Sequence, residues 1–443
     1  MSVLHLPPSQ SGAKRPSPGI PHRRWLIAFL LAFGVLVNYF DRVNLSVAKQ
    51  ALERDFGITN ITFGYLLSAY NWTYAALQIP MGVVLDRFGV QAVGRISAIL
   101  WSVACFAGAY APGVKAFFGS RLLLGIGEAP TFPSNAKAIG MWFPRQERSL
   151  ATAIFDSAAK FSTAIGTPLI GILLIHYGWR FSFSMTGVAS FVFFLAFYYL
   201  YRNPSDDKKL SEQERQYLKD NEALADKKSK NSGAGLLYLL ERRKVLGLAV
   251  GFAAYNYCFY LLLTWLPSYF TGALHLDLQA SVLYTSIPWL FATAMDLVVG
   301  GWLVDKLISR GFNDSLVRQT ILIGGMVMGL GLLGTIFTRT PIIAVVWISI
   351  SIGGLAASAP IAWSAPSLLA PHDSVAKVGS IMNFANQIAA IAAPIVTGYL
   401  IGFRNDYSRA FIAAAFAILA GIAGYAFLLG KIERIPEPEN AGE

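Results

Sequence analysis

Four ionisable residues stand inside long apolar stretches of the chain. Asp41 and Arg42 are neighbours in "NYFDRVNLSVA", close to the end of the first such stretch, whereas Arg121 and Glu128 lie seven residues apart in "RLLLGIGEAP". Seven residues of α-helix make about two turns and about 10.5 Å of rise, so the latter two side chains leave the same face. A charge inside a membrane span is expensive, which makes these four residues the first candidates for a functional site.

These residue types suit the exchange of an organic anion and a proton. Arginine stays charged at any accessible pH, and its planar fork fits a carboxylate. A carboxylic acid moved out of water is harder to ionise, so Asp41 or Glu128 could take up and release a proton. A proton on the acid would free an arginine from internal pairing, and the arginine could then accept a substrate anion.

A structural role is the alternative for each pair. Adjacent residues project about 100° apart on a helix, so Asp41 and Arg42 can flank a seam between helices. They could instead both lie in the outer interface of the membrane. Arg121 and Glu128 could form a buried bridge to another helix, and Gly125 between them leaves room for either a neighbour or a ligand.

A second group of charges is less easily interpreted. Asp156 and Lys160 are spaced i,i+4 in a later apolar stretch. They can neutralise each other on one helix, or Lys160 can serve as a further positive point for an anion. Asp296 has no partner that the sequence identifies, and its role stays open.

Uncharged polar and aromatic residues in the apolar stretches suit a polyol ligand, which needs many donors and acceptors and an aromatic platform. Taken singly, such residues more often join helices to one another. The candidates are Tyr39, Tyr74, Asn256, Trp363, Ser364, Asn383 and Asn386.

The composition indicates an all-α polytopic membrane protein. The chain has 443 residues, of which 55% are hydrophobic and 14% charged, and its mean hydropathy is +0.50. A transmembrane helix needs about 20 apolar residues. Twelve such spans are predicted at 25–47, 62–84, 91–111, 115–138, 148–175, 180–201, 245–270, 280–304, 317–338, 341–367, 377–402 and 408–430.

A charged segment at 202–244 divides the twelve spans into two six-helix bundles, 25–201 and 245–430. Within this segment "LSEQERQYLKDNEAL" predicts an amphipathic surface helix. Ser211 is its expected N-cap, and Glu214 three residues later would complete a capping box. Residues 1–24 and 431–443 are expected to be cytoplasmic arms.

The distribution of basic residues predicts the orientation. The net charge is +11, but the bases fall in loops that all lie on one side if both termini are cytoplasmic, as the positive-inside rule requires. This pattern argues against nucleic acid as a partner. No apolar segment precedes the basic cluster at 22–24, so we expect no cleavable signal peptide. Short outer loops favour a bacterial inner membrane, and Cys105 and Cys258 are expected to be ordinary packing residues.

The two halves share a short motif. "GVVLDRFG" begins at Gly82 and "GWLVDKLI" at Gly301. In each, an acid (Asp86 or Asp305) is followed by a base, and the acid could accept hydrogen bonds from the N-terminus of a facing helix. We expect Asp86, Arg87 and Asp305 to take part in conformational gating. Two parallel six-helix repeats are typical of transporters with two rocking halves.

The motifs "GVVLDRFG" and "RLLLGIGEAP", with the six-plus-six layout, resemble the major facilitator superfamily. "NYFDRVNLSVA" and "WFPRQERSLATAIF" narrow the resemblance to its anion:cation symporter family, which includes bacterial hexuronate, galactonate and glucarate transporters and, among animal proteins, vesicular glutamate transporters and sialin. The resemblance implies that the matching arginine binds the substrate carboxylate. It also implies that the matching acids, Asp41 and Glu128, serve proton coupling.

The predicted function is therefore a proton-coupled symporter that imports a small organic anion, such as a hexuronate, aldonate or aldarate, by alternating access. A proton-coupled antiporter or exporter of the same fold is the alternative. Sodium coupling stays open. We expect a monomer without cofactor or metal, and no enzyme, because the sequence has no HExxH, Gly-x-Ser-x-Gly or Walker A motif.

Overall fold

The computed structural model describes residues 22–144, 147–220, 234–371, 374–402 and 405–437; within them, the side chains of 79, 86, 148–150, 153 and 376 are not described. Throughout these ranges the chain forms helices and no strand. Ten helical segments in the described ranges are long and apolar enough to cross a membrane. The other two predicted spans correspond to the first part of α3 and to α4 with α5.

The N-terminal half contains α1 (Arg23–Val47), α2 (Lys49–Phe56), α3 (Asn60–Ala109), α4 (Val114–Glu128), α5 (Thr131–Trp142), α6 (Arg148–Tyr177) and α7 (Trp179–Leu200). Helix α3 holds two predicted spans, which meet at a kink where Gly89 has φ 76° and ψ 164°. Only glycine adopts such a conformation readily. The fourth predicted span is divided into α4 and α5 at Pro130, which has no backbone N–H to continue the helix.

The C-terminal half contains α10 (Arg243–Gly272), α11 (Leu278–Met295), α12 (Val304–Ser309), α13 (Asp314–Gly329), α14 (Pro341–Leu369), α15 (Val375–Ile401) and α16 (Ser408–Ala423). Three irregular helices complete it: the π-helix η1 (Asp296–Leu303), the 3₁₀-helix η2 (Leu330–Phe337) and the π-helix η3 (Gly424–Leu429). Segments α11, η1 and α12 follow one another without a break and form the predicted eighth span. The predicted all-α architecture of two six-helix halves is confirmed.

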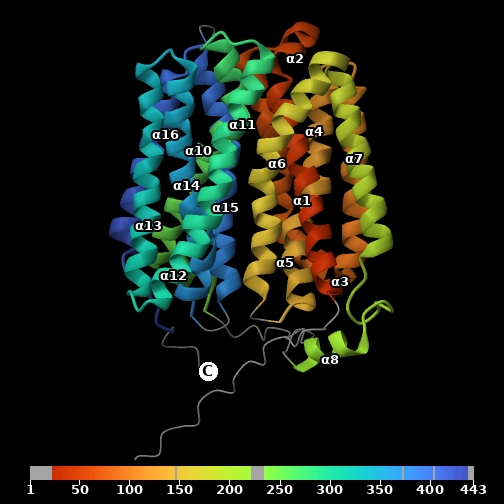
Figure 1. Cartoon of the computed structure of the whole chain (residues 1–443), viewed down its shortest axis with the longest axis vertical. Coiled ribbons are helices and arrows are strands. Elements are labelled where there is room, and N and C mark those ends of the chain that lie inside the picture. Colours follow the sequence, from red (N-terminus) through yellow and green to blue (C-terminus); the bar gives the residue numbers. More distant parts are fainter. Residues whose placement is uncertain (1–21, 145–146, 221–233, 372–373, 403–404, 438–443) are drawn as a thin grey trace, which may run out of the picture.

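The two halves stand side by side, with α6 of one next to α11 of the other (Figure 1). Helix α3 also packs against α15, and α1 against α10. Helix α2 lies at one end of the bundle, and α8 (Glu212–Asp220) lies at the opposite end, where the described chain also finishes (Figure 1). We call these the α2 end and the α8 end.

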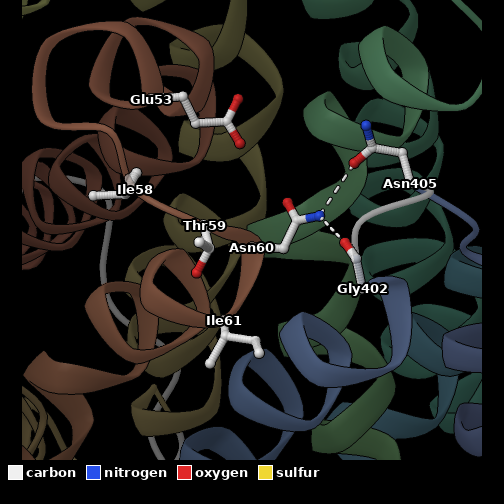
Figure 2. Close-up of a pocket in the computed structure, with 7 residues that line it drawn as sticks. All are labelled: Glu53, Ile58, Thr59, Asn60, Ile61, Gly402 and Asn405. Atoms are coloured by element: carbon white, nitrogen blue, oxygen red, sulfur yellow. Dashed lines mark hydrogen bonds between the residues drawn. The ribbon is translucent and has the colours of Figure 1, made fainter.

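The halves are joined by hydrogen bonds at the α2 end. The Asn60 amide donates to the Gly402 carbonyl and to Oδ1 of Asn405, which is 3.2 Å away. Figure 2 shows these contacts beside a small cleft of about 260 Å³ between the halves. Deeper in the seam, the Ser46 hydroxyl donates to the carbonyl of Thr264 at 2.8 Å. The α2 end is therefore closed in this structure.

The linker helix α8 attaches to the N-terminal half. Its predicted N-cap is confirmed, because the Glu214 N–H donates to the Ser211 hydroxyl at 3.1 Å. The carboxylate of Glu214 instead accepts from the backbone N–H groups of Arg23 and Arg24 and from the Arg24 guanidinium, at 3.0 to 3.2 Å. Arg24 also binds Glu147 at 2.7 Å. The Glu214 carboxylate binds the start of α1 and does not complete the capping box, because α1 offers it several N–H donors and the Ser211 backbone offers one.

Candidate functional site

A buried ion pair joins α1 to α4. Nη2 of Arg42 lies 3.2 Å from Oε2 of Glu128, and the two side chains are 5% and 0% exposed. The other oxygen of Glu128 and Nε of Arg42 have no hydrogen-bond partner within the described residues. Glu128 therefore forms a buried bridge to another helix, one of the alternatives that the sequence left open, and hydrogen-bonding capacity stays unused on both partners.

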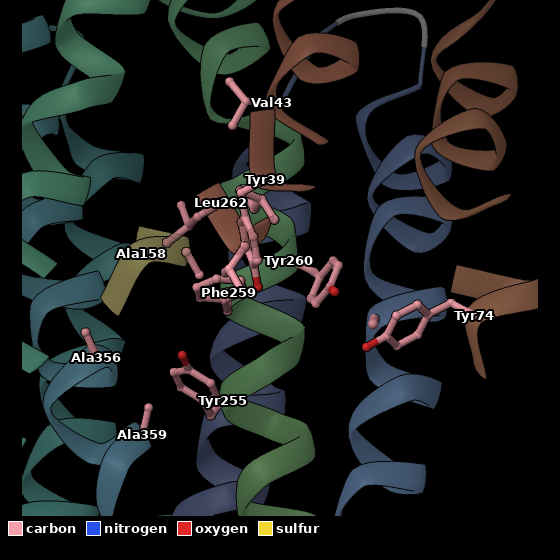
Figure 3. Packing of buried hydrophobic residues seen from close by; sticks show 14 of the residues in the cluster. Tyr39, Val43, Tyr74, Ala158, Tyr255, Phe259, Tyr260, Leu262, Ala356 and Ala359 are labelled. Carbon is pink, nitrogen blue, oxygen red and sulfur yellow. The ribbon is translucent and has the colours of Figure 1, made fainter. Parts of the chain in front are cut away.

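Tyrosines surround this guanidinium. The rings of Tyr39 and Tyr70 have centroids 4.4 and 4.8 Å from the guanidinium carbon of Arg42. Nη1 of Arg42 donates to the hydroxyl of Tyr260 at 3.3 Å, and the Tyr260 and Tyr70 hydroxyls are 2.7 Å apart. Tyr260 belongs to α10 and stands with Tyr39 and Phe259 between the halves (Figure 3). The C-terminal half thus contributes a hydroxyl to a cation of the N-terminal half.

Asp41 points away from this ion pair. Its carboxylate accepts a hydrogen bond from Nε1 of Trp101 at 2.6 Å and one from the thiol of Cys105 at 3.2 Å. All three residues are buried. Asp41 and Arg42 therefore flank a seam, as expected for adjacent residues on a helix, and Cys105 has a polar contact beyond simple packing.

Arg121, on α4, is buried as well. Its side chain is 4% exposed, and no carboxylate of the described chain forms an ion pair with it. Its guanidinium lies 6.0 Å from the ring centroid of Tyr70, and its Nε has no partner among the described residues. Gly125 makes room for a neighbour, because a β-carbon there would collide with the Tyr70 carbonyl oxygen. We call Asp41, Arg42, Arg121 and Glu128 the arginine cluster.

A second charged group lies between the halves. Nζ of Lys160 on α6 is 2.6 Å from Asp296 and 3.2 Å from Asp156. The contact with Asp156 is the predicted i,i+4 pair. The contact with Asp296 was not predicted, and it crosses from one half to the other. We call these three residues the lysine cluster.

The predicted polar candidates fall into two groups. Asn256, Asn386 and Asn383 form a chain of hydrogen bonds that joins α10, α15 and, through Gln78, α3. Tyr39 and Tyr74 are buried near the arginine cluster, where the ring centroid of Tyr74 is 6.1 Å from that of Tyr70. Tyr39 lies against the Arg42 guanidinium, so it is the one of these two tyrosines that directly contacts the arginine cluster.

The two candidates on α14 lie away from the arginine cluster. Trp363 packs edge-on against Phe252, with ring centroids 5.0 Å apart, and Ser364 accepts a hydrogen bond from Arg318 of α13. Among the predicted gating residues, Arg87 and Asp305 are exposed. The side chain of Asp86 lies outside the described residues. Asp305 makes no hydrogen bond to a facing helix in the part of the chain that the structure describes.

Several residues of the site were missed by the sequence analysis. Tyr70 lies four residues before Tyr74, and Trp101 lies four residues before Cys105. Helical spacing could therefore have placed each pair on one face of its helix. Tyr260 lies four residues after the candidate Asn256, so the same spacing could have placed it on that face of α10. Among the described residues, no group of three or more His, Cys, Asp or Glu could hold a metal ion.

Twelve spans in two packed halves, with buried bases and acids at and near their seam, define a membrane transporter. The chain belongs to the Major Facilitator Superfamily, whose family model matches residues 31–394.

Curated relatives narrow this class. An uncharacterised transporter of Bacillus subtilis is 39% identical over 96% of this chain and 98% of its own. A probable galactarate/D-glucarate transporter of Escherichia coli is 31% identical over 94% and 96%, and a D-galactonate transporter of Escherichia coli is 31% identical over 93% and 97%. These names confirm the resemblance to the anion:cation symporter family, and all three relatives are bacterial transporters rather than enzymes.

Solved structures of the same fold are more distant. A D-xylose–proton symporter matches with a TM-score of 0.71 at 18% identity, covering 94% of this chain and 100% of its own. A bacterial homologue of the human lysosomal transporter Spinster, in an inward-facing conformation, matches with a TM-score of 0.72 at 15% identity, covering 92% and 97%. At these identities the likeness establishes the fold alone.

Proposed function

We propose that the protein is a proton-coupled symporter that imports a sugar acid by alternating access, with Arg42 and Arg121 binding the carboxylate. The observation that carries this proposal is the buried Arg42–Glu128 pair, together with Arg121, a residue on the helix of Glu128 that forms no ion pair with a carboxylate of the described chain. Arg121 is available to an anion, and Arg42 becomes available when the carboxylate of Glu128 is neutralised.

Charge balance supports coupling to protons. The two clusters hold three bases and four carboxyl groups, so they carry a formal charge of −1 when all are ionised. An entering organic anion would add further negative charge, and uncompensated charge in a low-dielectric interior is costly. A proton on Glu128 removes one negative charge and releases Arg42, so the anion and the proton favour each other's binding.

The names of the relatives support the substrate class. Galactarate and glucarate are sugar diacids, and galactonate is a sugar monoacid. The tyrosines around Arg42 supply hydroxyl groups and apolar ring faces, which suit a polyhydroxylated chain. We extend the substrate class to this chain on both grounds.

We further propose that the α8 end is cytoplasmic and that Asp86, Arg87 and Asp305 act in gating. The basic loops support this orientation through the positive-inside rule. With the α2 end closed by Asn60 and its partners, the site would then be shut off from the outside in this conformation.

Thermal stabilisation tests the proposal directly. Purified full-length protein would be melted with a panel of uronates, aldonates and aldarates, because a ligand of the native state raises Tm by mass action. We expect at least one sugar acid to raise Tm of the unmodified protein and not of an Arg42→Lys variant. Uptake into proteoliposomes then tests direction: an inward proton gradient should drive accumulation of that sugar acid. Expulsion by the same gradient would identify an exporter, and no stabilisation by any sugar acid would contradict the proposed substrate class.

A further inference from the structure

Lys160 and Asp296 form the shortest ion pair between the halves in the described chain. The two side chains are 6% and 5% exposed, and their charged atoms are 2.6 Å apart. Asp156, on the same helix as Lys160, is 28% exposed and lies farther away, at 3.2 Å. A lysine ammonium has three N–H donors, so it can hold both carboxylates. The tighter partner is the one from the opposite half.

The backbone at Asp296 is unusual. The π-helix η1 begins at this residue and interrupts the α-helical path from α11 to α12. Short π-helical segments are rare and occur frequently at functional sites. This feature is independent of the ion pair, and it sets the carboxylate of Asp296 at the point where the helical pitch changes.

The lysine cluster repeats the arrangement of the arginine cluster. In each, a buried base is bound by a carboxylate of the protein: Glu128 on Arg42 and Asp296 on Lys160. Helix α1, which carries Arg42, packs against α6, which carries Lys160, so the two clusters stand on neighbouring helices. Two protein carboxylates therefore occupy two buried cations on neighbouring helices.

We propose that Asp296 is a specificity-determining residue, which occupies Lys160 until the second carboxylate of a dicarboxylic sugar acid replaces it. This inference rests on the proposed function. When the two halves separate at this seam, Lys160 remains in one and Asp296 in the other, and a buried ammonium loses its closest counter-ion. Loss of such a partner is costly. A dicarboxylate can supply the missing charge while its first carboxylate is held at the arginine cluster, whereas a monocarboxylate cannot.

The test compares galactarate with galactonate, which differ by one carboxylate, in binding to the purified full-length protein. Lys160→Gln should weaken galactarate binding about tenfold or more, as expected for loss of a charge-assisted contact. Galactonate binding should change by less than about twofold in the same variant. Asp296→Asn removes the competing charge and should strengthen galactarate binding while leaving galactonate binding unchanged.

Equal effects on both sugar acids would overturn the inference, as would an Asp296→Asn variant that loses galactarate affinity to the same extent as Lys160→Gln. A combined Lys160→Gln and Asp296→Asn variant replaces the ion pair with a neutral hydrogen-bonding pair, and its galactonate binding reports whether the site has folded. Sugar-acid binding can depend on Arg42 and still respond equally for galactarate and galactonate to the Lys160 and Asp296 substitutions. That result would overturn the role of Asp296 and leave the proposed function standing. Failure of the unmodified protein to bind either compound would overturn both.

Discussion

The guanidinium of Arg42 binds the carboxylate of Glu128 at 3.2 Å, although 86 residues separate them in the chain. The bond connects the first apolar helix with the fourth predicted span, and both side chains are buried. Under the proposed function, a substrate carboxylate and Glu128 would compete for this arginine, and a proton on Glu128 would free Arg42 for the substrate.

The first prediction concerns the planar guanidinium groups of Arg42 and Arg121. Arg42→Lys and Arg121→Lys keep the positive charge but lose the planar pair of donors. We expect each variant to bind sugar acids about ten to one hundred times more weakly, as judged by ligand-induced shifts in Tm. Arg202→Lys, at the partly exposed end of α7, is the matched control and should bind normally. Normal binding by both site variants would place the carboxylate site elsewhere.

The carboxylates of the arginine cluster should control coupling. Asp41→Asn and Glu128→Gln mimic the protonated state, so both should abolish accumulation driven by a proton gradient in proteoliposomes. Exchange of substrate at equal concentrations should survive, because exchange moves no net proton. Glu212→Gln, exposed on α8, is the control and should accumulate substrate normally. Full gradient-driven uptake by both site variants would remove these two acids from the coupling mechanism.

The orientation can be read from cysteine labelling in intact cells. Cys105 and Cys258 are buried, so the background reaction should be low. A Lys208→Cys variant, exposed next to α8, should not react with a membrane-impermeant thiol reagent, whereas Arg54→Cys, exposed on α2, should react. The reverse result would invert the proposed orientation.

The closure at the α2 end predicts a shift in conformation. Asn60→Ala removes both hydrogen bonds, to Gly402 and to Asn405, and should increase the population that is open at this end. A cysteine at Ser46, which is 1% exposed in the seam, should then be labelled faster than in the background with Asn60 intact. Ser120→Cys, buried within the N-terminal half, is the control and should stay unreactive in both backgrounds. An unchanged rate at Ser46 would show that Asn60 does not hold the halves together.

Glu214 should stabilise the N-terminal half through α1. Glu214→Ala leaves buried N–H donors of α1 and part of the Arg24 guanidinium without their acceptor. Such a loss costs about 1–3 kcal/mol, so the melting temperature of the purified protein should fall. Glu212→Ala, on the exposed face of the same helix, should melt like the unmodified protein. A similar Tm for both variants would mean that water replaces the carboxylate at no cost.

The helical spans were predictable because membrane burial imposes a long apolar stretch on each of them. The breaks at Gly89 and Pro130 coincide with residues that disfavour a continuous helix, but sequence alone did not distinguish α4 and α5 as separate helices. The sequence analysis did not predict the π-helix that begins at Asp296, because no helical-spacing rule used there indicates a local change of pitch.

The site was predictable where spacing on one helix decides the geometry. The shared face of Arg121 and Glu128, the divergence of Asp41 and Arg42, and the Asp156–Lys160 pair all follow from helical periodicity. The bonds from Lys160 to Asp296 and from Arg42 to Tyr260 depend on which helices meet across the two halves. Local pattern carries no information about such contacts, so only the structure reveals them.

The hydroxyl of Tyr260 has a thermodynamic consequence. It belongs to one half of the molecule and binds Arg42 and Tyr70 of the other, so it is at once part of the proposed ligand site and part of the seam. A ligand that displaces this hydroxyl from Arg42 weakens the association of the halves by some free energy. Linkage is reciprocal, and therefore any condition that parts the halves changes ligand affinity by the same amount. Comparison of a Tyr260→Phe variant with the unmodified protein can measure either the change in ligand affinity or the change in the free energy of association of the halves. Each of these two changes yields the other.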